Sequence, residues 1–67
     1  MNEYYKLLVQ FQTGEKITYH RLLRLPGVTA ELVNNAEKQG YIQRATPTDD
    51  GDVRYMITQK GKEKRDN

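Results

Sequence analysis

The chain has 67 residues and no cysteine, so we expect one small domain without disulfides or thiolate metal sites. No apolar run approaches the roughly 20 residues of a membrane span, and the first residues lack a secretory pattern. These features predict a soluble, cytoplasmic protein. Eleven Lys and Arg against nine Asp and Glu leave a formal net charge of only +2, so the distribution of charge says more about partners than its sum.

A first helix is predicted over residues 2–12 from apolar residues at helical spacing. These residues are Tyr4, Tyr5, Leu8 and Phe11. Leu7 and Val9 flank this stripe and widen it. The wider apolar stripe is explained if the rest of the domain covers most of the helix. The alternative is that the exposed part of the stripe is an edge that binds a second copy of the chain or another protein partner. Thr13 and Gly14 are expected to end the helix.

A helix-corner-helix follows. Residues 16–17 are expected to form a short strand that pairs with a later hairpin. Thr18 is a good N-cap for a helix over residues 19–25, which Pro26 and Gly27 then break. A helical wheel of this segment places on its inward face Tyr19, Leu22 and Leu23. The same wheel places on its outward face His20, Arg21 and Arg24.

The next helix is predicted to start at the N-cap Thr29, to reach Gln39 and to stop at Gly40. A period of 3.6 residues buries Thr29, Leu32, Val33 and Ala36. The outward residues are Ala30, Glu31, Asn34, Asn35 and Lys38. Asn can bind adenine through two hydrogen bonds, and Lys can reach guanine or phosphate. An ordinary solvated helix face, however, has the same polar character.

Residues 41–46 and 53–58 are rich in β-branched and aromatic residues and flank the turn-rich segment 47–52, which predicts a hairpin. If Thr46 pairs with Val53, two cross-strand pairs face the helices. These pairs are Arg44 with Tyr55, the arginine lying on the tyrosine ring, and Ile42 with Ile57. Arg54 and Met56 then point the other way. The most buried residues are expected to include Leu22, Leu23, Leu32, Val33, Ile42 and Ile57.

The last nine residues, 59–67, contain no apolar residue and include Gly61. We expect them to fray as a basic tail behind a core of residues 2–58, all within a single domain of residues 1–67. The hairpin tip carries three carboxylates but lacks the alternating ligands of a calcium loop, so it is interpreted as an acidic turn.

Three segments together resemble the winged helix-turn-helix superfamily. They are "ITYHRLLRLPGVT", "AEKQGYI" and "DVRYMITQKG". The last is similar to the return strand of the wing in MarR-type regulators, with Asp52 and Arg54 followed by Ile57, Thr58 and Gly61. The resemblance implies an α+β fold with three helices and a small antiparallel sheet, in the order helix, strand, helix, helix, strand, strand. It also implies that the third helix recognises DNA and that Arg54 enters the minor groove.

The interpretation of function that follows is a small DNA-binding protein, a bacterial or phage-type transcriptional regulator or accessory factor that works as a dimer or in a larger complex. Base contacts are expected from Ala30, Glu31, Asn34, Asn35 and Lys38. Contacts with the DNA backbone are expected from His20, Arg21, Arg24, Lys60 and Lys62. A basic surface without a partner is the plain alternative for the second group.

A protein-interaction module, an adaptor or anti-regulator that uses the first helix or the wing, is the alternative function. Glu31 and the acidic hairpin tip favour it, because phosphates repel both. An enzyme is not expected: there is one His, no Cys and no phosphate-cradling glycine motif, and a chain this small encloses no dry pocket. No cofactor or metal is expected either, since the lone His20 has no second ligand to complete a zinc site.

Overall fold

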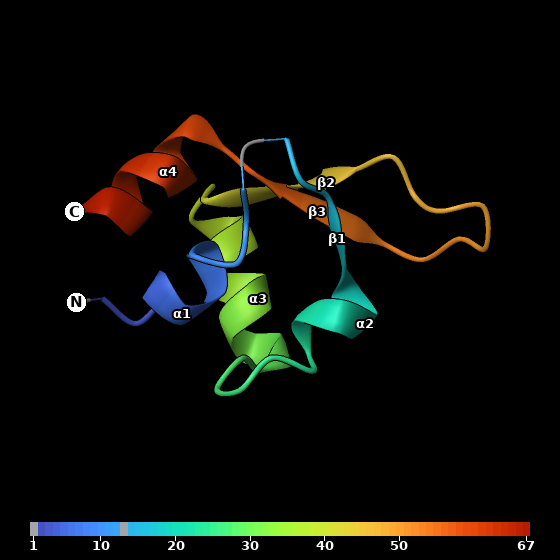
Figure 1. The fold of residues 1–67 in the computed structure, drawn as a ribbon, viewed down its shortest axis with the longest axis horizontal. Helices are drawn as coiled ribbons and strands as arrows, with labels where there is room; N and C mark the ends of the chain where they lie inside the picture. The colour runs from blue at the N-terminus through green and yellow to red at the C-terminus, as the bar shows by residue number, and fades with distance from the viewer. Residues whose placement is uncertain (1, 13) are drawn as a thin grey trace.

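The structure is a computed structural model, and it describes residues 2–12 and 14–67. It shows a small α+β protein with a three-stranded antiparallel sheet. The elements in chain order are α1 (Tyr5–Leu8), β1 (Ile17–Thr18), α2 (Tyr19–Leu22), α3 (Ala30–Lys38), β2 (Ile42–Ala45), β3 (Arg54–Ile57) and α4 (Gln59–Asp66) (Figure 1). The expectation of an α+β fold is confirmed. The expectation of three helices is wrong, because the segment expected to fray forms α4.

The sheet has the strand order β1-β3-β2, with β3 in the centre. The hairpin has the predicted register, in which Arg44 pairs with Tyr55 and Ile42 with Ile57. The short β1 strand pairs with β3 as expected, with Ile17 opposite Tyr55. In Figure 1, α4 lies at one end of the molecule and the β2–β3 loop projects from the other.

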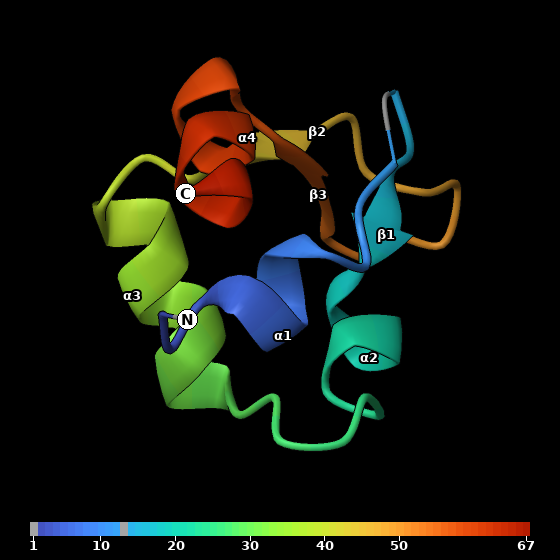
Figure 2. The ribbon, with the colours of Figure 1, turned by 60° about the vertical axis from the view of Figure 1, so that its left-hand side comes forward.

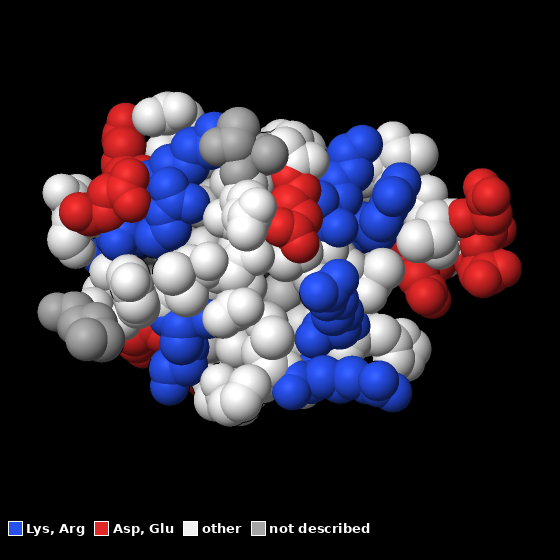
Figure 3. All heavy atoms as spheres, in the orientation of Figure 1, with Lys and Arg blue, Asp and Glu red and all other residues white. Residues whose placement is uncertain are grey.

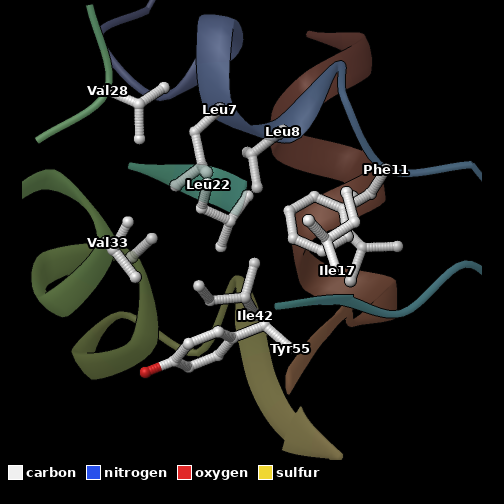
Figure 4. Close-up of a cluster of buried hydrophobic side chains, with 11 residues drawn as sticks. Leu7, Leu8, Phe11, Ile17, Leu22, Val28, Val33, Ile42 and Tyr55 are labelled. Atoms are coloured by element: carbon white, nitrogen blue, oxygen red, sulfur yellow. The ribbon is translucent and has the colours of Figure 1, made fainter. Parts of the chain in front are cut away.

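Helices α1, α2 and α3 and the sheet together enclose the core, whose side chains come from each of these elements (Figure 4). The largest fully buried side chains are Phe11, Leu7, Leu8, Leu22, Ile42 and Val33. Of the six residues expected in the core, four are buried, namely Leu22, Val33, Ile42 and Ile57, whereas Leu32 is half-buried. The prediction for Leu23 is wrong, because this side chain is 39% exposed.

Helix α2 is shorter than predicted, and this accounts for the position of Leu23. The helix ends after Leu22, with Leu23 as its C-cap. The amides of Arg24 and Leu25 then donate to carbonyls three residues back, which tightens the last turn and removes the 3.6-residue period. The wheel drawn for residues 19–25 therefore does not hold beyond the first turn.

Helix α1 is also shorter than predicted, and Leu7 is fully buried in the core. The amides of Tyr5, Gln10 and Phe11 donate to carbonyls three residues back, so turns replace the expected helix ends. The proposed partner edge on Leu7 is therefore wrong, whereas Val9 is 42% exposed. The stop expected at Thr13 lies outside the described residues.

Helix α4 is fixed to the rest of the protein, contrary to the expectation of a frayed tail. The hydroxyl of Thr58 accepts a hydrogen bond from the Gly61 amide at 3.0 Å, which caps the helix. Arg65 donates from Nη1 to the carbonyl of Phe11 at 3.1 Å, and the Asn2 side chain donates to the carbonyl of Lys64 at 3.1 Å. These long-range bonds hold α4 against α1 (Figures 1 and 2).

Tyr41 provides the apolar surface that sequence analysis did not find for α4. The Nζ atoms of Lys60 and Lys64 lie 5.5 and 5.8 Å from the centroid of the Tyr41 ring. The same ring meets the Tyr4 ring edge-on at a centroid distance of 5.0 Å. Gly61 is buried against the carbonyl of Tyr41. A Cβ atom at this position would overlap that carbonyl, so only glycine fits here. The side chains of Lys60 and Lys64 and the small Gly61 thus make the contacts with Tyr41 that apolar residues of α4 would otherwise make.

Candidate nucleic-acid interface

Helices α2 and α3 are joined by a corner whose geometry is fixed by the sequence. The hydroxyl of Thr18 accepts from the amide of Arg21 at 3.2 Å, and that of Thr29 accepts from the amide of Leu32 at 3.1 Å. Both predicted N-caps are therefore confirmed. Gly27 has a φ of 77°, a conformation that glycine adopts without strain. Together these features hold the two helices in a defined relation.

The outward face of α3 is solvent-exposed as predicted. Ala30, Glu31, Asn34 and Lys38 are exposed, and Asn35 is half-buried. The inward side differs from the prediction at two positions, because Leu32 is only half-buried and Thr29 is exposed. Thr29 stands before the first turn, where its hydroxyl serves as the cap. Val33 and Ala36 are buried as expected. The five outward residues thus form one accessible polar surface, here called the α3 face.

The basic residues of the α2 segment are also accessible. His20, Arg21 and Arg24 are all exposed. Within residues 2–12 and 14–67, the ion pairs join Arg44 to Glu37 and Arg65 to Asp66, so Arg21 and Arg24 remain without a carboxylate partner there. Figure 3 shows Lys and Arg side chains gathered over the α2 region. This positive charge is available for an external anion.

Lys60 and Lys62 do not join this group. They belong to α4, which lies apart from α2 in both views of the ribbon (Figures 1 and 2). The stem of Lys60 instead approaches Gly40, just after the end of α3. Lys60 is exposed and Lys62 is half-buried. The five residues expected to contact a DNA backbone therefore occupy two separate surfaces.

Arg54 lies at the base of the hairpin and not at its tip. Its Nε donates to the carbonyl of Thr46 at 2.7 Å, across the two strands, and the residue is half-buried. The tip is closed by its own bonds, in which the hydroxyl and carbonyl of Thr48 accept from the amides of Asp52 and Gly51. Exposed carboxylates occupy the projecting end of the molecule (Figure 3). The tip therefore repels phosphate, while Arg54 stays at the base.

The surface also contains an ion pair that sequence analysis did not predict. Arg44 was expected on the ring of Tyr55, but its Nε instead donates to Glu37 Oε2 at 3.0 Å. The signal in the sequence was the opposite charge of two residues on either side of the Gly40 turn, which reverses the chain between α3 and β2. The pair connects helix α3 to the hairpin.

No family model matches the chain, and no curated protein or solved structure is significantly similar to it. In the described part of the chain, no group of His, Asp and Glu side chains is arranged to hold a metal ion. None of the helices within residues 2–12 and 14–67 is long and apolar enough to cross a membrane.

Proposed function

We propose that the chain is a winged helix DNA-binding domain that acts as a transcriptional regulator or an accessory factor. The observation that supports this most is the combination of a capped α2–α3 corner with an accessible polar α3 face and with Arg21 and Arg24, which form no ion pair within the described residues. The element order from α1 to β3, with β1 as the third strand, agrees with the resemblance in sequence. In this proposal α3 is the recognition helix.

The dimensions of α3 suit this role. An α-helix with its side chains is about 10–12 Å across and the major groove of B-DNA is about 12 Å wide, so the nine residues of α3 fit into the groove. Asn34 and Asn35 offer the amide groups that bind adenine through two hydrogen bonds, and Lys38 offers an ammonium group to guanine or phosphate. Ala30 contacts a thymine methyl group, and Glu31 accepts from the amino group of cytosine.

Phosphate contacts come from the α2 segment, in which Arg21 lies on the helix and Arg24 just beyond its C-cap. Such contacts fix the register of a protein on DNA without reading its sequence. Arg54 approaches the backbone from the hairpin base, and the acidic tip remains outside the groove. Because one short module buries little surface, we expect tight binding only when two copies occupy neighbouring half-sites.

A second function, protein binding without DNA, is favoured by a different observation. Three large apolar side chains are partly exposed, namely Tyr5, Val9 and Leu23, with exposed fractions of 39%, 42% and 39%. An adaptor or anti-regulator would use such side chains or the acidic tip, and its binding would not require Arg24. The two functions are therefore distinguished by the variants below.

Two substitutions are expected to affect DNA binding in different ways. Contacts with about four phosphates give a slope of log K against log salt of about −3.6, and each lost contact flattens it by about 0.9. Arg24→Ala should therefore weaken binding to all sequences alike and flatten the slope. Asn34→Ala should keep the slope but reduce discrimination between a site selected from a random pool and a scrambled duplex. Fluorescence anisotropy with labelled duplexes measures both quantities.

Lys64→Ala is the matched control, because it removes one positive charge from α4, which lies apart from α2 (Figures 1 and 2). It should leave both the slope and the discrimination unchanged. Equal flattening by Lys64→Ala and Arg24→Ala would show that only net charge matters, and that the α2 segment has no specific position on the DNA.

A further inference from the structure

We infer that Arg44 is a phosphate contact at the edge of the α3 face, and that Glu37 is the residue that positions its guanidinium. The inference rests on the proposed function and deepens it, because it adds a contact from the hairpin that neither the resemblance nor the residue pattern assigned. It starts from the ion pair between Arg44 Nε and Glu37 Oε2, at 3.0 Å.

The guanidinium of Arg44 is held in place and yet remains accessible. Its side chain is 60% exposed, whereas that of Glu37 is 30% exposed. Glu37 raises the pKa of Arg44, which agrees with a direct charge contact. Across the β-ladder Arg44 is paired with Tyr55, a buried residue whose pKa is raised first by burial and then by Glu37. The side chain of Arg44 therefore lies between β2 and α3, with its exposed part facing solvent.

The position of Glu37 places this arginine beside the α3 face. Residues three and four apart on a helix are neighbours, so Glu37 and Lys38 both lie one turn beyond Asn34. Glu37 is on the side of the helix that faces β2, since it bonds to Arg44 there. When α3 lies in a major groove, a side chain at this edge reaches the phosphates that border the groove.

The chemistry of the guanidinium favours phosphate over a base. Arginine carries five N–H donors in a planar fork, and among the described residues its hydrogen bond to Glu37 uses Nε. A further donor of the guanidinium faces Tyr55, and the exposed remainder of the fork is left for an external acceptor, where parallel N–H donors match two phosphate oxygens. A carboxylate that fixes Nε orients this fork before DNA arrives, so less side-chain entropy is lost on binding.

The role of Arg44 is tested by the salt dependence of binding to a labelled mixed-sequence duplex. Arg44→Gln removes the charge but retains an amide that can donate to Glu37, so the fold should be preserved. We expect its slope of log K against log salt to be flatter than that of the wild type by about 0.9. Arg44→Lys should retain the slope, and the control Lys64→Ala should retain it as well.

The role of Glu37 is tested by a matched pair of variants. Glu37→Gln and Glu37→Ala both remove the negative charge, but only glutamine offers an oxygen to Arg44 Nε. We expect Glu37→Gln to bind about two- to tenfold more tightly than Glu37→Ala. This difference should disappear when Arg44→Gln is added to both, because the acceptor then has no guanidinium to orient. A purely structural role of Glu37 would preserve the difference.

The outcomes separate this inference from the function on which it rests. A steep slope in the wild type that is unchanged in Arg44→Gln would overturn the assignment of Arg44 and leave DNA binding intact. Equal affinities of Glu37→Gln and Glu37→Ala would overturn the positioning role. Absence of salt-dependent binding by the wild type would refute the proposed function, and the inference with it.

Discussion

Leu22→Ala is expected to lower the free energy of unfolding by about 2–5 kcal/mol, because it leaves a cavity among fully buried side chains. Leu22 has no exposed surface and lies between α1, α3 and the sheet (Figure 4). A domain of this length has a total stability of about 3–10 kcal/mol. The variant should therefore be largely unfolded at moderate urea, which urea titration followed by circular dichroism would measure.

The adjacent residue provides the control for this experiment. Leu23→Ala removes the same atoms from a side chain that is 39% exposed at the end of α2, so its cost should be below about 1 kcal/mol. The ratio of the two effects tests where α2 ends. Comparable costs for both substitutions would mean that the helix continues past Leu22 and buries both leucines.

Gly61→Ala is expected to destabilise the protein by about 1–3 kcal/mol through overpacking. A methyl group on Gly61 would overlap the carbonyl of Tyr41 and lie 2.8 Å from Cγ1 of Ile57. Neither the strand nor the turn can move away without breaking the Thr58 cap, whose hydroxyl also donates to the carbonyl of Gly40 at 2.6 Å. Thermal unfolding with matched urea titrations would give the size of the effect.

The sign of this effect is diagnostic. In a helix without tertiary contacts, Gly→Ala stabilises by about 1 kcal/mol, since alanine has the higher helix propensity. A stabilised Gly61→Ala variant would therefore show that the end of the chain is a loose helix or a frayed tail. Glu63→Ala, at an exposed position of α4, is the control and should change stability by less than about 0.5 kcal/mol.

The sequence was most informative where two constraints coincided. Alternation along residues 53–58 and the turn chemistry of residues 47–52 indicated a hairpin in which pairing of Thr46 with Val53 places Ile42 opposite Ile57, and the structure has this pairing of the two isoleucines. Thr18 and Thr29 were recognisable because a cap residue stood directly before each helical stripe. Local chemistry and the burial pattern agreed at each of these places.

The predictions from sequence were wrong for segments whose structure depends on tertiary contacts and not on a periodic apolar pattern. The α4 segment has no apolar residue, and only the folded chain brings it to the Tyr41 ring and the carbonyl of Phe11. Leu7 and Leu23 were misplaced because their helices are one turn long, and a wheel of 3.6 residues does not apply to turns closed three residues back.

The candidate site shows the same division. The exposed residues of the α3 face follow from the periodicity of a nine-residue helix, so they were correctly placed as outward. The separation of Lys60 and Lys62 from the α2 arginines depends on where α4 packs. The partnership of Glu37 with Arg44 depends on the angle between a helix and a strand. The sequence shows the opposite charges of the pair, but neither this angle nor the place where α4 packs can be read from a one-dimensional pattern.

The measurement that tests the DNA-binding proposal most directly is a titration of the isotope-labelled protein with mixed-sequence duplex DNA, followed by amide chemical shifts at about 50 mM salt. We expect shifts on α2, on α3 and at the base of the hairpin near Arg44, with α1 and the hairpin tip unchanged. The same shifts should disappear as salt is raised. If α2 and α3 remain unperturbed in excess duplex, the protein does not recognise DNA through this face.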